Sequence, residues 1–343
     1  MNCFKKPGST AFFISLVLLL LPLTTSCSVR SSSTGSTPGS AGAGDSAVIS
    51  AVVTFDALYE LAAAVGGDRV SVRNIMPPGA EAHHFEPSAR DLELLNTADL
   101  FMICGFGFEP WADSAVKAAG NDKLGIFDVS KGVDPIVPDE DRDGISGNTQ
   151  TARAGNGTGD GPGNRGHESH DHHDGQFDPH IWLSPSCAVI MARNIADAFI
   201  ESDPGGAEYY RQNFDELSIR LKDLAKEYSE KFETLENRTI VTGHAVFAYL
   251  CRDFGLTQNS VEGVFAEGEP SARALAELID FCRAYSVRVI LAESLSSPLV
   301  AETLASEAGA SVSVIYTMES AEDGLSYLER MEHNLEVIYK SLQ

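Results

Sequence analysis

The sequence is poor in positive charge. It contains 25 Lys and Arg residues against 49 Asp and Glu residues, which gives a formal net charge of −24. A protein that binds nucleic acid needs a basic surface to neutralise phosphates, so this class of partner is excluded. An acidic surface suits an exported protein and attracts cations weakly, but it does not identify a ligand.

Cysteine is also scarce, with 6 in the whole chain and no Cys-x-x-Cys pair, which argues against a cysteine zinc site. Four cysteines lie beyond the N-terminal region. Two of them, Cys251 and Cys282, fall on predicted helices of the C-terminal half. Small buried thiols are the expectation, and a disulfide between these two, which an exported compartment permits, is the alternative. The four are Cys104, Cys187, Cys251 and Cys282.

No apolar run is long enough to cross a bilayer comfortably, because crossing takes about 20 residues. The apolar segment 11–21 follows Lys5 and Lys6, which is the pattern of a secretory signal over residues 1–26. The signal ends at Leu-Thr-Thr-Ser-Cys, which resembles a bacterial lipobox and makes Cys27 the expected lipidation site. An ordinary cleaved signal is the alternative. Residues 27–46 are rich in Ser and Gly and predict a flexible tether to the membrane.

The common hydrolase motifs are missing as well. The segment His-Glu-Ser-His-Asp spaces its two histidines by three residues, whereas a zinc protease helix needs a spacing of four. No Gly-x-Ser-x-Gly motif occurs in the chain. A secreted zinc hydrolase therefore stays an alternative without motif support.

What the sequence does contain is a regular alternation of strand and helix patterns. This alternation predicts α/β architecture with parallel, doubly wound sheets. We expect an N-terminal lobe over 47–203, a long linking helix over 204–236 and a C-terminal lobe over 237–343. The predicted strands are 47–54, 69–76, 99–105, 123–130, 238–244, 260–265, 287–293 and 311–316, and the predicted helices are 55–67, 88–98, 109–120, 184–203, 204–235, 245–254, 269–286, 298–308 and 324–342.

One segment, 131–175, breaks the alternation. It is rich in Gly, Asp and Asn, so we expect a flexible insert. Within it, residues 139–144 match the start of a calcium loop, but Gln150 stands where the bidentate Glu would be. A solvated acidic run is the favoured interpretation and a weak calcium site the alternative.

The histidines are the most informative residues. Three of them lie far apart in the chain, each in its own motif and each at an apparent strand end. Such residues converge only through a fold, which is how a rigid metal site is usually built, and imidazole is a common metal ligand. The three motifs are PPGAEAHHFEPSARD with His83, FDPHIWLSP with His180 and TGHAVFAYL with His244.

Together with GFGFEPW, DPGGAEYYRQNF, GEPSARALAELI and SYLERMEHNL, these motifs resemble the metal-binding lipoproteins of ABC transporters of the zinc and manganese class, in particular the zinc-specific type with a His-rich loop. The resemblance implies two (β/α) lobes joined by one long helix, with the metal in the cleft between them. It also implies a monomer that binds a metal ion outside the membrane, performs no catalysis and delivers the ion to a permease. An adhesin role is attached to some members of this class.

The resemblance assigns the metal ligands residue by residue. His83, His180 and His244 match the three histidine ligands, with His84 as the adjacent alternative to His83. Glu319 is the candidate fourth ligand, and Glu293 is the second choice.

Three neutral imidazoles plus one carboxylate or water suit Zn²⁺, whereas two imidazoles and two carboxylates would suit Mn²⁺ better, so zinc is expected and manganese is the alternative. The tract just before His180 predicts accessory, low-affinity zinc capture, with a plain polar loop as the alternative. His333 has no motif support and is expected on a solvated face. The tract residues are His167, His170, His172 and His173.

Overall fold

The computed structural model describes residues 49–80, 82, 85–138, 177–264, 271–295 and 297–343. Several predictions concern other positions and lie outside the described residues. They are the signal, Cys27, the tether, His83, His84, the calcium-like stretch 139–144 and the tract His167, His170, His172 and His173.

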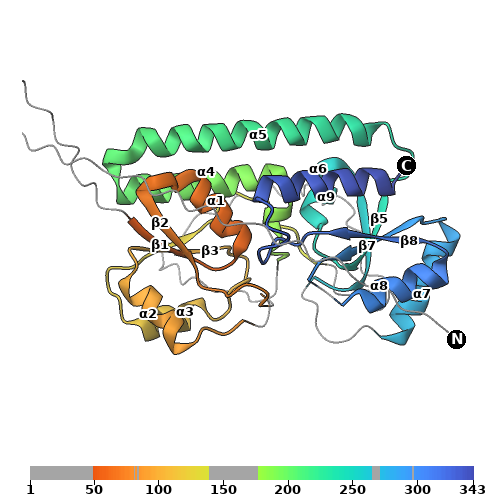
Figure 1. The fold of residues 1–343 in the computed structure, drawn as a ribbon, viewed down its shortest axis with the longest axis horizontal. Coiled ribbons are helices and arrows are strands. Elements are labelled where there is room, and N and C mark those ends of the chain that lie inside the picture. Colours follow the sequence, from red (N-terminus) through yellow and green to blue (C-terminus); the bar gives the residue numbers. More distant parts are fainter. Residues whose placement is uncertain (1–48, 81, 83–84, 139–176, 265–270, 296) are drawn as a thin grey trace, which may run out of the picture. The chain divides into compact units, whose positions relative to one another are not determined.

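The first lobe is built on a parallel sheet with strand order β2-β1-β3-β4. Both faces of this sheet are covered, as parallel sheets require. Val53 of β1 points into the core beside α1 and α4, while its neighbour Val52 points into a second cluster beside α2 and α3. Figure 1 shows these helix pairs on opposite sides of the sheet. The elements are β1 (Ile49–Val53), α1 (Asp56–Gly66), β2 (Val70–Asn74), α2 (Ala89–Thr97), β3 (Leu100–Ile103), α3 (Ala112–Ala119), β4 (Gly125–Asp128) and α4 (Pro185–Ser202).

The second lobe repeats this plan with strand order β6-β5-β7-β8, again parallel. Leu291 of β7 packs in the cluster that contains α6 and α9, and Ile290 packs with α7 and α8. The predicted two-lobe α/β fold is therefore confirmed. The predicted start of β6 at residue 260 was wrong, because the strand begins at Thr257. The elements are β5 (Thr239–His244), α6 (Ala248–Phe254), β6 (Thr257–Glu262), α7 (Ala272–Ala284), β7 (Val289–Glu293), α8 (Pro298–Ala308), β8 (Ser311–Ile315) and α9 (Tyr327–Ser341).

One long helix, α5 (Ala207–Glu233), connects the two lobes. Its 27 residues span about 40 Å at a rise of 1.5 Å per residue. The helix packs on α1 and α4 of the first lobe and on α6 and α9 of the second, and Figure 1 shows it running along both. The predicted start at Pro204 was three residues early, because Pro204–Gly206 forms a 3₁₀ turn.

The four cysteines of the described region are all buried and all free. The alternative of a Cys251–Cys282 disulfide was therefore wrong, and the expectation of buried thiols is confirmed. Burial raises the thiol pKa of Cys187 and of Cys282 to about 11. Burial also raises the pKa values of Cys104 and Cys251.

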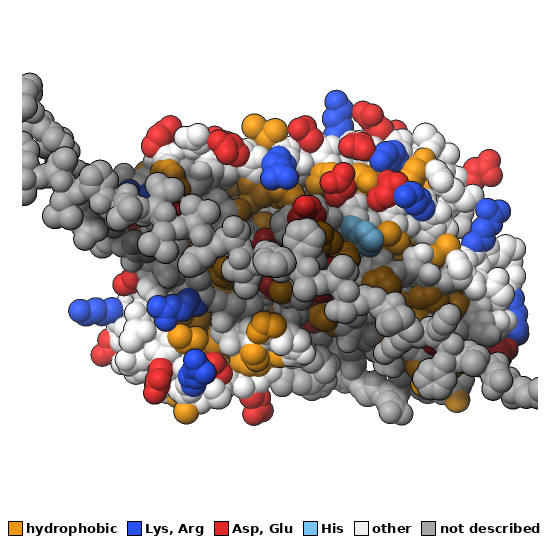
Figure 2. All heavy atoms as spheres, in the orientation of Figure 1, with side chains coloured by type: hydrophobic (Ala, Val, Ile, Leu, Met, Phe, Trp, Pro, Cys, Tyr) orange, Lys and Arg blue, Asp and Glu red, His pale blue; other side chains and the backbone are white. Residues whose placement is uncertain are grey.

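Charges of both signs cover the surface. Figure 2 shows Asp and Glu side chains interspersed with Lys and Arg over the described part of the visible face. Among the described helices, none has the length and apolar character needed to cross a membrane.

The junction between α4 and α5 generates a test of the fold. The Asp203 carboxylate accepts hydrogen bonds from Arg69 Nη2 (2.5 Å) and from the Tyr210 hydroxyl (3.0 Å). A Cβ atom on Gly206 would lie 2.5 Å from Asp203 Oδ2 and 2.6 Å from Arg69 Nε. Crowding of this kind costs about 1–3 kcal/mol, so Gly206→Ala should lower the free energy of unfolding in urea by that amount.

Gly205→Ala is the matched control for this prediction. A Cβ atom there meets only Asp203 Oδ1, at 3.4 Å, which is ordinary contact. The control should stay within about 0.5 kcal/mol of the parent. Equal effects of the two substitutions would contradict the described junction.

Candidate metal-binding site

His180 precedes the 3₁₀ turn Ile181–Leu183 and does not end a strand, so that part of the sequence prediction was wrong. Its ring is fully buried in the first lobe against the rings of Phe108 and Trp182. Asp178 Oδ1 accepts hydrogen bonds from both the main-chain N–H and Nδ1 of His180, each at 2.9 Å. A carboxylate bonded to one ring nitrogen fixes the tautomer and orientation of a metal-binding imidazole. In the neutral ring that donates through Nδ1, the lone pair lies on Nε2.

The electrostatics around His180 favour a cation. Burial lowers the pKa of His180 and raises the pKa of Asp178. The second carboxylate oxygen of Asp178 is buried and accepts no hydrogen bond from any residue in the described ranges. A buried carboxylate without full compensation is costly, and a nearby positive ion offsets that cost.

His244 is the last residue of β5 in the second lobe. Its main-chain N–H donates to Glu293 Oε1 (3.0 Å), and its carbonyl accepts from the Thr242 hydroxyl (2.7 Å) and the Gln258 amide (2.8 Å). The ring atom Nε2 lies 2.8 Å from the carbonyl oxygen of Val264. Because a carbonyl only accepts, Nε2 carries the proton in this arrangement and the lone pair of the neutral ring lies on Nδ1.

His180 and His244 lie side by side although they belong to different lobes. Their ring centroids are 5.3 Å apart and the ring planes are perpendicular. Two imidazoles at this separation can share one ion between them after small movements, because zinc–nitrogen bonds are about 2.0–2.1 Å long.

The two acidic candidates have different surroundings. Glu319 is buried in the segment between β8 and α9, and its carbonyl accepts a hydrogen bond from the Asp56 N–H (3.1 Å). Glu293 ends β7, and its carboxyl group faces the main chain of Gly243 and His244. Burial raises the pKa of Glu293 to about 7. The structure therefore gives Glu293 a role in supporting His244.

His83 lies outside the described residues, but the chain just before it is described. The N–H of Gly79 donates to the hydroxyl of Ser320 (2.6 Å), which is the residue after Glu319. The motif of His83 therefore contacts the segment of Glu319. Within the described ranges, no group of three or more His, Cys, Asp or Glu side chains is arranged to hold a metal ion. The described residues bring together the His180–His244 pair and not a full ligand set.

Sequence reasoning missed two buried acids near this pair. Asp178 stands two residues before His180, and an acidic residue at that spacing was an available signal. Glu109, in the GFGFEPW motif, accepts hydrogen bonds from the Thr54 hydroxyl (2.5 Å) and the Cys104 N–H (2.8 Å). Burial raises its pKa to about 7. His333 was predicted on a solvated face, but it is half-buried on α9, where its ring packs on Tyr316.

The whole-chain comparisons agree with this two-lobe arrangement. The family model "Zinc-uptake complex component A periplasmic" (ZnuA) matches residues 51–341. The fold is that of a substrate-binding protein that serves a transporter. The chain belongs to the ZnuA family of zinc-uptake components.

Relatives and solved structures extend over nearly the same region. A protein of Treponema pallidum (strain Nichols) is 40% identical over 84% of this chain and 86% of its own length. The high-affinity zinc uptake system protein ZnuA of Bacillus subtilis (strain 168) is 33% identical over 99% of this chain and 98% of its own. The laminin-binding protein of Streptococcus agalactiae, described as having adhesin and metal-transporting activity, is 31% identical with a TM-score of 0.72, covering 86% of this chain and 100% of that one.

The hydrogen bonds of Asp178 predict an effect on zinc binding. Asp178→Ala removes the acceptor that orients His180, and loss of such a partner typically weakens metal affinity about 10–100-fold. The measurement is a competition titration of zinc against a chromophoric chelator. The control Asp280→Ala changes a carboxylate whose side chain is 82% exposed on α7 and should leave the affinity unchanged. Unchanged affinity in Asp178→Ala would contradict an orienting role.

The buried acids predict how stability depends on pH. Glu109 and Glu293 have folded-state pKa values of about 7, above the unfolded value of about 4.3. Their stabilising contribution is full below the unfolded pKa and is lost as pH rises through 7. Burial lowers the pKa of His180, so His180 destabilises the folded protein below about pH 6.5 and offsets part of the stabilisation from the two acids. The metal-free protein should therefore unfold at higher urea concentration at pH 5.5 than at pH 8.

A matched pair of variants tests the source of that dependence. Glu109→Gln should reduce the difference between the two pH values, whereas Glu307→Gln, at an exposed position on α8, should not. If both variants keep the full difference, the dependence does not arise from burial of Glu109.

Proposed function

We propose that this chain captures Zn²⁺ outside the cytoplasm and delivers it to an ABC permease for uptake. The observation that carries the proposal is the pair His180 and His244, which come from different lobes and lie with ring centroids 5.3 Å apart. Membership of the zinc-uptake family supports zinc as the cargo.

The proposed ligands are His83, His180, His244 and Glu319. Three imidazoles and one carboxylate form the nitrogen-rich, four-coordinate set that zinc accepts. Manganese would be better served by more oxygen ligands, so we do not favour it as the cargo. An ion held by His180 and His244 joins the two lobes directly. Occupancy of the metal site is therefore linked to the contact between the lobes.

The proposal describes binding without catalysis. Catalytic zinc needs an open coordination position and a general base beside it, whereas a set of four protein ligands holds an ion for transfer. Family membership as a transport component supports this view.

We further propose a membrane-anchored monomer. The support is sequence alone: Cys27 ends a lipobox-like motif, and residues 27–46 are rich in Ser and Gly. Lipidation of Cys27 would hold the protein near its permease, and a flexible tether would let it reach that partner. The tract His167, His170, His172 and His173 would capture zinc loosely before it enters the site.

The central test compares two histidines. His244→Ala should abolish tight zinc binding, because it removes a ligand of the second lobe. His333→Ala is the control, since His333 lies on α9 outside the candidate site. The measurements are metal content of protein purified without added metal, and competition of manganese against zinc. The parent should hold one tight ion and prefer zinc. Retention of that ion in His244→Ala would refute the site.

A deletion separates the site from the tract. Removing residues 167–174 should leave one tight ion, because the tract is proposed only for loose capture. Zinc should still raise the melting temperature of the deletion variant as it does for the parent, since a ligand that binds only the folded state stabilises it. Loss of the tight ion in the deletion variant would assign high-affinity binding to the tract.

A further inference from the structure

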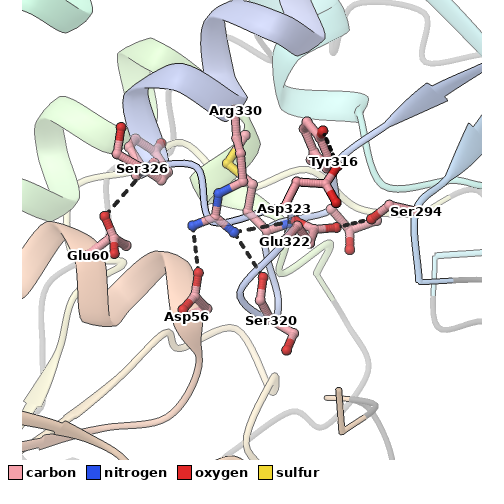
Figure 3. Close-up of polar contacts among 12 residues, drawn as sticks. Asp56, Glu60, Ser294, Tyr316, Ser320, Glu322, Asp323, Ser326 and Arg330 are labelled. Carbon is pink, nitrogen blue, oxygen red and sulfur yellow. Dashed lines mark hydrogen bonds and ion pairs between the residues drawn. The ribbon is translucent and has the colours of Figure 1, made fainter. Parts of the chain in front are cut away.

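A buried ion-pair network lies where the two lobes meet. Arg330, on α9 of the second lobe, is fully buried. Its Nη2 donates to Asp56 Oδ2 of α1 in the first lobe (2.5 Å). Its Nη1 donates to the Ser320 carbonyl (2.8 Å) and to Glu322 Oε2 (3.3 Å). Figure 3 shows the guanidinium group between Asp56 on one side and the Ser320 and Glu322 groups on the other.

Two of the three acceptors of Arg330, Ser320 and Glu322, belong to one short segment. This segment, residues 317–322, lies in the connection between β8 and α9 and includes Glu319, the proposed fourth zinc ligand. The first N–H groups of α1, those of Asp56 and Ala57, donate to the carbonyls of Glu319 (3.1 Å) and Met318 (3.0 Å). This end of α1 has no side-chain cap, so the segment satisfies helix donors that would otherwise be unpaired.

The same segment is bonded at further points. The Trp182 indole donates to the Thr317 carbonyl (2.7 Å). The Glu322 carboxylate accepts from the Met318 N–H (3.0 Å) and from the Ser294 hydroxyl. Met318 has φ of 59°, a conformation that a non-glycine residue keeps only when its surroundings enforce it. Partners from both lobes therefore hold the segment of Glu319 in one conformation, and Arg330 contacts residues of both lobes.

An arginine is suited to this position for a geometric reason. Its planar guanidinium presents five donors in a fixed fork, so it can bind Asp56, Ser320 and Glu322 together. A lysine ammonium would carry the charge without the fork. Because the group is buried, loss of its charge would leave two acidic side chains without their shared cation.

We propose that Arg330 is a positioning residue for zinc capture: by binding Asp56 of the first lobe and Ser320 and Glu322 of the second, it fixes the segment that presents Glu319 to the ion. This inference rests on the proposed function. It requires that Arg330 act on zinc through Glu319, and not only through general stability of the fold.

A double-mutant cycle tests this requirement. Zinc dissociation constants are measured by chelator competition for the parent, Arg330→Met, Glu319→Gln and the double variant. Arg330→Met should weaken zinc binding about 10–100-fold, as expected for loss of a residue that orients a ligand. In the Glu319→Gln background the same substitution should have almost no further effect. Arg330→Lys should resemble Arg330→Met, because it lacks the fork.

The controls separate the outcomes. Arg283→Met removes an exposed arginine that pairs with Glu307, and it should leave zinc affinity at the parent value. If Arg330→Met fails to fold, Asp56→Asn replaces it in the cycle, since it weakens the inter-lobe pair while keeping the side-chain shape.

Two results would overturn the inference. One is zinc affinity of Arg330→Met within about twofold of the parent, far from the range expected for an orienting residue. The other is an Arg330→Met effect that multiplies fully with that of Glu319→Gln, as independent sites do. Failure of the proposed function looks different, because Glu319→Gln and His244→Ala would then both keep the parent affinity.

Discussion

The side chain of Trp182 connects the parts of this molecule that matter for metal capture. It is fully buried, and its ring packs on Phe55, Phe108 and His180 at centroid distances of 4.5, 4.9 and 5.1 Å. Its indole N–H donates to the segment of Glu319, and its carbonyl accepts from the Tyr327 hydroxyl at the start of α9 (2.6 Å). A single aromatic residue thus fixes the position of one candidate ligand and bonds to the chain that carries another.

Around this centre, the structure buries several acidic side chains. Asp178, Glu109 and Glu293 are all buried, and burial raises the pKa of each. Acidic groups in such surroundings are stabilised in their charged form when a cation is bound nearby. Arg330 supplies a positive charge at the Glu319 segment, whereas the pair His180 and His244 is the proposed site of an incoming ion.

The order of strands and helices could be predicted from the sequence because the central strands β1, β3, β5 and β7 are runs of mostly buried residues between helix signals. The start of β6 could not, because its first residues, Thr257, Gln258 and Asn259, are polar. Gln258 is buried and donates to the Thr242 hydroxyl and the His244 carbonyl, a role that no hydropathy pattern reveals.

The candidate site could also be predicted only in part from the sequence. His180 and His244 were singled out from their motifs, and Glu293 was named only as a possible ligand, while Asp178 was missed. Arg330 lies on α9 between Glu329 and Met331, and nothing in these neighbours marks it as buried. Its partner Asp56 is 274 positions away in the chain. Only the packing of α9 against α1 brings these two residues together, and the local sequence does not reveal that packing.

The buried thiols have a consequence for the choice of zinc-binding groups inside the protein. Sulfur binds zinc as the thiolate and not as the thiol. Because burial raises the pKa values of Cys104, Cys187, Cys251 and Cys282, these groups stay protonated at neutral pH. A thiophilic ion entering the protein therefore meets no competing sulfur ligand among these four.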